Sequence, residues 1–106
     1  MPTILTDQHV KNLNRWWTVA DAGAPITFDY QASDRSSWSN SASYRAIARL
    51  RMRVRLRGTF VSFRVAMLHG GSIQDVEAKC QQAVREAEAF VAECNRLRLP
   101  RDAKEA

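Results

Sequence analysis

The sequence has few of the residues that most often carry chemistry in proteins. Cysteine and histidine occur twice each, and no CxxC motif or Cys/His metal spacing is present. Cys80 and Cys94 lie in a segment that we expect to be helical, which separates them by about 21 Å. They cannot pair within that helix, because a disulfide needs Cα atoms within about 7 Å. This cysteine usage predicts a reduced, cytoplasmic setting.

Long apolar runs are also missing. No segment approaches the roughly 20 apolar residues that a membrane-spanning helix needs, so we expect no membrane partner. The N-terminus lacks the basic start and apolar centre of a signal peptide, which again favours a cytoplasmic protein. The 106 residues are enough for a single domain, and their hydrophobic content of 45% is ordinary for a globular protein.

No catalytic arrangement of side chains is evident. His9 and His69 are far apart in the sequence, and the acids of the C-terminal segment are most simply its solvated face. Gly70-Gly71 precedes an expected helix, whose N-terminus can hold an anion, but the rest of a phosphate loop is missing. The sequence therefore predicts a protein that is not an enzyme and that takes no cofactor or metal.

Lysine is scarce, whereas arginine is abundant, with 3 lysines against 13 arginines. The basic excess is confined to residues 31–68, which carry eight arginines against Asp34, although the whole chain has a net charge of only +5. Arginine forms bidentate hydrogen bonds with phosphate or carboxylate and stacks on flat rings. Either a negatively charged partner or a compositional bias of the genome accounts for the ratio.

The arginines alternate with apolar residues. Arginine occupies every odd position from Arg49 to Arg57, and apolar residues occupy the even positions from Ala48 to Leu56. A strand sends successive side chains to opposite faces, whereas a helix would spread these arginines around its circumference. The pattern predicts a strand over residues 45–57 with one arginine-lined face and one apolar face.

A second strand is expected directly after the first. Residues 59–68 are rich in β-branched and aromatic side chains, and Gly58 suits a tight hairpin turn centred on Arg57-Gly58. The pairs expected on the apolar face are Leu56 with Thr59, Val54 with Val61, Met52 with Phe63, Leu50 with Val65 and Ala48 with Met67. On the other face, Arg49, Arg51, Arg53 and Arg55 are expected opposite Ala66, Arg64, Ser62 and Phe60.

Five further segments complete the expected domain. Residues 6–22 have helical spacing, and residues 26–30 alternate like a third strand of the sheet. Residues 31–43 contain six serines and predict a flexible loop. Residues 73–98 predict a long helix, followed by a frayed tail at 99–106. The expected fold class is α+β, an α-β-β-β-α two-layer domain whose three-stranded antiparallel sheet packs on the long C-terminal helix, with the arginine-rich hairpin face outward.

The tryptophans of the first helix and the loop have specific expected roles. Thr6 is the expected N-cap of the first helix, and Gly23 is its expected C-cap. Two adjacent tryptophans cannot both be buried by one helix, so we expect Trp17 to point inward and Trp16 to lie at an edge or interface. Trp38, in the serine-rich loop, either folds back on the domain or anchors a partner.

The long helix has apolar residues that step by three and four along the chain. Ser72 is its expected N-cap, with Asp75 acting as in a capping box. The apolar stripe either packs on the sheet or, from Phe90 onward, overhangs the sheet and joins a second copy. The stripe consists of Ile73, Val76, Cys80, Ala83, Ala87, Phe90, Cys94 and Leu97.

The arginine-lined face predicts binding of a negatively charged partner. Arg51 opposite Arg64 is a repulsive pair, and neither hairpin strand carries an acid to offset it. We therefore expect a nucleic-acid-binding module, for DNA more than RNA, in which arginines meet phosphates and base edges. Phosphate contacts are expected from Arg45, Arg49, Arg57 and Arg64, base-edge contacts from Arg51, Arg53 and Arg55, and further contacts from Phe60 and Trp38.

The expected layout resembles known nucleic-acid-binding folds. Three strands with a packed helix are similar to the plant AP2 domain and to the arm-binding domains of phage-type integrases, and this likeness is one of layout only. The order α-β-β-β-α is also that of double-stranded RNA-binding domains. Those domains open their last helix with a lysine-rich turn, whereas this chain has Ile73-Gln74-Asp75, which argues against membership.

Two alternatives remain open. One is a small non-enzymatic inhibitor or adaptor, of the kind that mobile elements encode, which docks the same basic face on an acidic protein partner through Arg51, Arg53, Trp16 and Trp38. The other is a homodimer through residues 73–98, which is compatible with either function and would double the basic surface.

Overall fold

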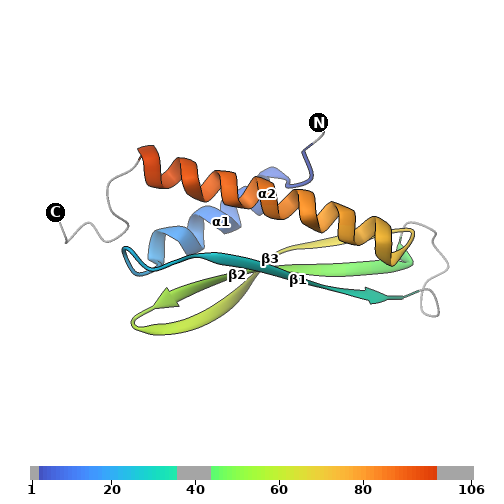
Figure 1. The fold of residues 1–106 in the computed structure, drawn as a ribbon, viewed down its shortest axis with the longest axis horizontal. Helices are drawn as coiled ribbons and strands as arrows, with labels where there is room; N and C mark the ends of the chain where they lie inside the picture. Colours follow the sequence, from blue (N-terminus) through green and yellow to red (C-terminus); the bar gives the residue numbers. More distant parts are fainter. Residues whose placement is uncertain (1–2, 36–43, 98–106) are drawn as a thin grey trace.

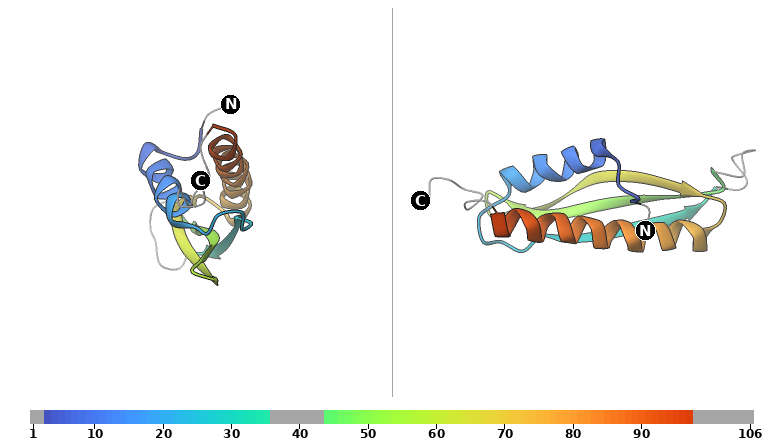
Figure 2. Two further views of the ribbon diagram at one scale, coloured as in Figure 1. Left: turned by 90° about the vertical axis from the view of Figure 1, so that its left-hand side faces the viewer. Right: turned by 90° about the horizontal axis from the view of Figure 1, so that it is seen from above.

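The computed structural model describes residues 3–35 and 44–97 as two helices and three strands. The strands form one antiparallel sheet in the order β1-β2-β3, and both helices cover the same face of that sheet (Figure 1 and Figure 2). The expected α+β order is confirmed. The elements are α1 (Asp7–Val19), β1 (Thr27–Asp34), β2 (Ala46–Leu56), β3 (Thr59–Gly70) and α2 (Ile73–Leu97).

Helix α1 begins as expected and ends earlier than expected. The Thr6 hydroxyl accepts a hydrogen bond from the His9 backbone N–H, and His9 Nδ1 accepts one from the Thr6 N–H, so two N–H groups at the helix start are satisfied. The helix ends before Ala20 because the next residue, Asp21, donates its backbone N–H to the Arg55 carbonyl at 2.8 Å. Gly23 adopts a φ of 75° in the following turn instead of capping the helix.

The two tryptophans of α1 divide as the sequence predicts. Trp17 is buried in the core between the helices and the sheet. Trp16 is only half-buried and stacks on Phe63 of β3, with ring centroids 3.7 Å apart and ring planes within 3°. Arg15 lies over the Trp16 ring at 4.7 Å from its centroid. The pair therefore places one indole in the core and the other at the edge of the domain.

The hairpin turn is confirmed at Arg57-Gly58. These residues have φ values of 52° and 84°, as the left-handed two-residue turn of a hairpin requires. Glycine adopts this conformation without strain, whereas Arg57 is a non-glycine residue held there. The expected pairs from the turn to the middle of the hairpin are confirmed: Leu56 with Thr59, Val54 with Val61, Met52 with Phe63 and Arg51 with Arg64.

A β-bulge changes the register in the second half of the hairpin. The shift falls between Leu50 and Arg51, so that Leu50 pairs with Ala66 and Ala48 pairs with Leu68. A bulge sets two residues of one strand against one of the other, and every later pair moves by one position. The expected pairs that it overturns are Leu50 with Val65, Arg49 with Ala66 and Ala48 with Met67.

The bulge also changes which side chains of β3 are buried. Val65 and Ala66 are both buried, with 1% and 4% of their surface exposed, and Leu68 is buried as well. Met67, which we expected in the core, is 42% exposed. Because side chains alternate along a strand, one inserted residue transfers all later residues to the other face.

Strand β1 extends further than expected. It runs from Thr27 to Asp34, so the first four residues of the expected 31–43 loop belong to the strand. They are ordered by pairing with β2, for example Gln31 with Arg49, and backbone hydrogen bonds outweigh their loop-like composition. Phe28 and Tyr30 pack against the core as expected. Trp38 and residues 36–43 lie outside the described residues.

The apolar stripe of α2 packs on the sheet within the same chain. Five of its members are buried and Phe90 is half-buried, whereas Leu97 is 65% exposed. Ser72 Oγ accepts the Asp75 backbone N–H at 3.1 Å, which confirms the expected N-cap. Most of the apolar stripe that we expected at a dimer interface is buried against the sheet of the same chain. The homodimer through residues 73–98 stays a prediction. The buried members are Val76, Cys80, Ala83, Ala87 and Cys94.

Candidate nucleic-acid interface

The arginines of β2 lie on the face of the sheet opposite the helices. Along β2, the even-numbered residues from Ala46 to Val54 are buried, while the arginines between them are half-buried or exposed. Both helices cover the other face (Figure 1), so the alternation of a strand directs the arginines away from the core. We call this surface the arginine face. It consists of Arg49, Arg51, Arg53 and Arg55 on β2 and Phe60, Ser62 and Arg64 on β3.

The centre of the arginine face is a row of three charged residues across the sheet. Asp29 of β1 is in register with Arg51, and Arg51 is in register with Arg64. Asp29 is not among the site residues that the sequence predicts, although its position between the core residues Phe28 and Tyr30 already implies the opposite face. Within residues 3–35 and 44–97, no ion pair within 4.0 Å joins Asp29 to either arginine. One carboxylate thus lies near two like charges without neutralising them directly.

A second carboxylate, Asp21, holds the tip of the hairpin. Its Oδ2 lies 3.1 Å from Arg55 Nε and accepts the Gly58 N–H at 2.9 Å, while its Oδ1 accepts the Arg57 N–H at 3.0 Å. The backbone N–H groups of Gly58 and Arg57 hold the pKa of the Asp21 carboxyl below its usual range. Desolvation opposes them with a smaller effect, and the Arg55 guanidinium then contributes to the lowering. Arg55 is therefore held beside the turn by an ion pair, whereas Arg51 and Arg53 have no carboxylate within 4.0 Å among the described residues.

Phe60 adds an aromatic surface beside the arginines. Its side chain is 42% exposed, and the Arg53 guanidinium carbon lies 5.1 Å from the centre of its ring. Arginine at this distance from an aromatic ring is attracted by the negative face of the π-system. Sequence analysis placed both residues on this face, and the structure brings them together.

The far end of the same face is apolar and aromatic. Met67 is in register with Arg49, and His69 is in register with Ile47. His69 stacks on Tyr44, with ring centroids 4.2 Å apart, and Tyr44 is largely exposed. Met67, His69 and Tyr44 are not among the site residues that the sequence predicts. For Met67 and His69 the reason is the β-bulge, which is not visible in the apolar run from Val65 to Leu68.

Two of the proposed site residues, Arg57 and Arg45, lie away from the centre of the face. The Arg57 side chain is exposed in the turn. Arg45 is exposed at the other end of the sheet, where it lines a hollow of about 440 Å³ with Asp34 and the start of α2. Trp38 lies outside the described residues. The structure therefore brings together Arg49, Arg51, Arg53, Arg55, Phe60 and Arg64.

The Gly70-Gly71 turn does not offer an open anion site. Asp75 Oδ2 accepts the Gly71 N–H at 3.2 Å, so a carboxylate of the chain already occupies the position of an anion. A Cβ atom added to Gly70 would lie 2.3 Å from the same oxygen, so a side chain at this position would displace the Asp75 carboxylate. The Gly70-Gly71 pair before the helix is thus explained by capping of the α2 N-terminus and not by an open site for an anion.

Comparisons with known proteins provide no assignment. No protein-family model, curated protein or solved structure matches the chain. Within the part of the chain that the structure describes, no three His, Cys, Asp or Glu side chains gather as ligands for a metal ion. The helices of that part are also too short or too polar to cross a membrane.

Proposed function

We propose that the protein binds nucleic acid through the arginine face, with DNA favoured over RNA. The observation that carries the proposal is a cluster of arginines without ion pairs. Among the described residues, no carboxylate lies within 4.0 Å of Arg49, Arg51, Arg53 or Arg64. Arg51 and Arg64 repel each other across the ladder, and bound phosphates would relieve that repulsion.

The geometry of a strand suits a regular polyanion. Side chains on one face of an antiparallel strand recur about every 6.8 Å. A nucleic-acid strand in a duplex carries one phosphate per about 3.4 Å of axis, so the arginine spacing corresponds to every second phosphate. The proposed phosphate contacts are Arg49 and Arg57, toward the two ends of the hairpin, and Arg64, beside Arg51 on the neighbouring strand. Arg51 and Arg53 lie at its centre, where their guanidinium groups suit the O6 and N7 acceptors of guanine.

Phe60 and Arg55 have supporting roles in this proposal. The exposed ring of Phe60 offers a surface for stacking on a base or for contact with a thymine methyl group. Arg55 is held by Asp21 and keeps the hairpin tip in place, so that Phe60 and Arg57 are presented together. Arg45 is left as a predicted contact outside this central surface, and Trp38 as a predicted contact that lies outside the described residues.

The test is a binding titration at several salt concentrations with a labelled DNA duplex, a single strand and an RNA hairpin. Wild type is compared with Arg51→Glu/Arg53→Glu and with a control, Lys11→Glu/Arg96→Glu, which changes the charge equally on exposed helix positions. We expect log affinity to fall by roughly 0.9 per phosphate contact for each log unit of salt. We also expect loss of binding in the first variant and not in the second. An affinity that is flat in salt, or equal losses in both variants, would contradict the proposal.

A second candidate function is docking on an acidic protein, as a small inhibitor or adaptor. It is favoured by Phe60 and Met67, which are both 42% exposed and flank the arginines. Exposed aromatic or methionine side chains beside arginine are typical of protein interfaces. A single protein that is recovered by pull-down, is lost with Arg53→Glu and is unaffected by nuclease would favour this function over nucleic-acid binding.

A further inference from the structure

The two edges of the sheet differ in how they are protected. Helix α1 covers the outer edge of β3, where Asn12 Nδ2 donates to the Val65 carbonyl at 3.0 Å and Trp16 stacks on Phe63. The β-bulge lies on the same strand. Coverage and bulges are two of the devices by which proteins prevent a strand edge from pairing with another chain.

Helix α2 packs over the face of β1, but along residues 28–32 no side chain in the described part of the chain binds the outer edge of β1 as Asn12 binds that of β3. β1 pairs with β2 on one side only, and no described residue outside β2 forms a hydrogen bond with Phe28, Asp29, Tyr30, Gln31 or Ala32. An uncovered edge strand presents unpaired N–H and C=O groups to any extended segment that approaches. This edge is therefore the one at which the sheet can grow.

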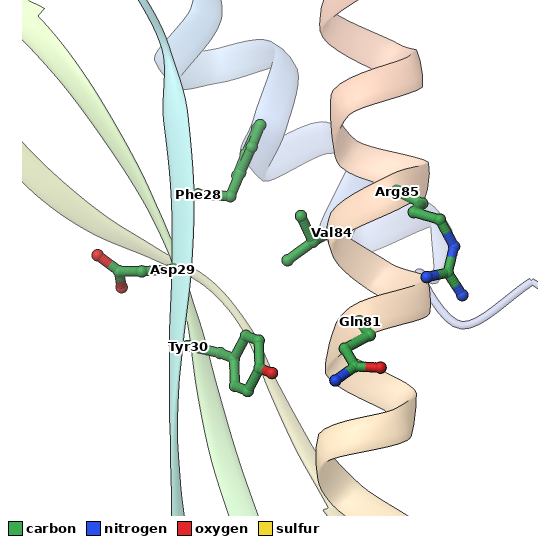
Figure 3. A pocket seen from close by; sticks show the side chains of 6 residues that line it. All are labelled: Phe28, Asp29, Tyr30, Gln81, Val84 and Arg85. Atoms are coloured by element: carbon green, nitrogen blue, oxygen red, sulfur yellow. The ribbon is translucent and has the colours of Figure 1, made fainter.

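A groove runs beside this open edge, between β1 and α2. Its volume is about 470 Å³, which lies in the range of ligand pockets. Figure 3 shows Phe28 and Tyr30 directed toward α2, Val84 directed back toward β1, and Asp29 directed away. Phe28, Tyr30 and Val84 form an apolar wall, and all three are half-buried. The groove therefore offers a partly exposed apolar surface next to the backbone groups of the β1 edge.

We propose that β1 and α2 form a binding groove for an extended peptide segment of another protein. The peptide adds to the sheet as a fourth strand beside β1 and inserts apolar side chains at alternate positions between Phe28, Tyr30 and Val84. Main-chain hydrogen bonds to a strand edge supply affinity in this mode, and pockets for alternate side chains supply specificity. The groove lies at the edge and on the helix side of the sheet, so it is distinct from the arginine face.

The positive charge of Arg85, at the rim of the groove, favours a peptide that carries an acidic residue. Arg85 is exposed, and its Nη2 donates to Gln82 Oε1 at 2.9 Å. Among the described residues no carboxylate lies within 4.0 Å of its guanidinium. A carboxylate on the bound peptide would pair with Arg85, so the preferred peptide alternates apolar residues and carries an Asp or Glu on the helix side.

A second copy of this chain paired antiparallel through its own β1 does not fit the same edge. Helix α2 runs above β1 (Figure 2), and a copy paired through its own β1 would carry its α2 in the equivalent place. Paired strands lie about 4.8 Å apart, whereas packed helices need about 8–10 Å between their axes. A segment without a covering helix avoids this conflict, which favours a peptide over self-association.

The test is selection of a displayed library of random eight-residue peptides on the immobilised protein, followed by titration of the enriched peptides. We expect enriched sequences with apolar residues at alternate positions and an acidic residue. Val84→Arg fills the groove and should weaken binding by about tenfold or more. Val19→Arg, the same change at an exposed position of α1, should leave binding unchanged. Arg85→Glu should reverse the preference for an acidic residue.

Amide hydrogen exchange locates the bound peptide. Peptide binding should slow exchange at alternate amides of β1, because only every second N–H of a strand points to a given edge. Failure to enrich any peptide, equal binding to Val84→Arg, or protection elsewhere with none in β1 would each overturn the proposal. Protection of β1 that depends on protein concentration without peptide would also overturn it, in favour of a second copy. None of these outcomes involves nucleic acid, so they are independent of the function proposed for the arginine face.

Discussion

Asp21 Oδ2 lies 3.1 Å from Arg55 Nε, and the same carboxylate accepts hydrogen bonds from both residues of the hairpin turn. The two residues are 34 positions apart in the chain. The connection after α1 therefore fixes the hairpin tip, which extends past the end of β1 as a two-stranded ribbon. Removal of the carboxylate should loosen the tip without disturbing the core.

The Asp21 contact predicts an acid-dependent turn. The pKa of Asp21 is lower in the folded protein than the unfolded value of about 3.9. Its ionised form therefore stabilises the fold above about pH 4, and this contribution is lost as the pH falls through the folded-state pKa. In amide NMR spectra from pH 7 to pH 2, the Gly58 and Arg57 N–H signals should titrate with a pKa below 3.9. Asp21→Asn should abolish this titration, whereas Asp29→Asn should preserve it; titration that survives Asp21→Asn would contradict the assignment.

Glu86 predicts a second carboxylate-dependent contact, between α2 and the N-terminal segment. Its carboxylate accepts the Ile4 N–H at 3.0 Å and the Leu5 N–H at 2.9 Å. Burial is the largest single effect and raises the pKa of Glu86. Hydrogen bonds from these N–H groups and from Gln82, with the charge of Arg85, together outweigh burial and leave the pKa below its usual range. Glu86→Gln should speed amide exchange at both residues and lower the free energy of unfolding by about 1 kcal/mol. The neighbouring exposed Glu88→Gln should do neither, and equal effects would argue against the contact.

The β-bulge predicts which of two adjacent residues stabilises the fold. Leu68 is buried and Met67 is 42% exposed, the reverse of a hairpin without a bulge. Leu68→Ala should lower the free energy of unfolding by roughly 2–3 kcal/mol, because it leaves a cavity in the core. Met67→Ala should change it by about 0.5 kcal/mol or less. Urea denaturation of the two variants measures the difference, and a larger cost for Met67→Ala would refute the observed register.

Burial predicts that Cys80 is chemically inert in the folded protein. Desolvation, with a smaller effect of Glu77, raises the pKa of the Cys80 thiol to about 11. Because the thiolate is the reactive form, alkylation at pH 8 should proceed only when the chain unfolds. Mass spectrometry after iodoacetamide treatment, with and without denaturant, measures this directly. Rapid labelling of Cys80 in the absence of denaturant would show that the residue is accessible.

The parts of the fold that the sequence predicts correctly are those with a local signal. The strict alternation from Ala48 to Leu56 defines both faces of β2, and Gly58 marks the turn. The three-and-four spacing of α2 likewise defines the stripe that packs on the sheet. In each case one element contains all the information, because side-chain periodicity alone decides burial.

The parts that the sequence did not predict depend on contacts between distant segments. The bulge falls where Val65, Ala66, Met67 and Leu68 are all apolar, so no alternation reveals an inserted residue. The extension of β1 depends on pairing with β2, and the role of Asp21 depends on a turn far along the chain. For the site, alternation predicts the arginines, whereas their carboxylate neighbours require the register of the whole sheet.

Because of the β-bulge, the two ends of the open face of the sheet carry different side chains from β3. On the side of the hairpin turn, β3 contributes Phe60, Ser62 and Arg64 to that surface, and beyond the bulge it contributes Met67 and His69. A ligand that spans the sheet along the strands would meet the Arg64 guanidinium and the Phe60 ring of β3 at one end, and the Met67 thioether and His69 imidazole of β3 at the other. A uniform polymer has no preferred orientation on a uniform surface, but on this one the two orientations differ in energy. A single inserted residue thereby sets the polarity with which a long partner would lie.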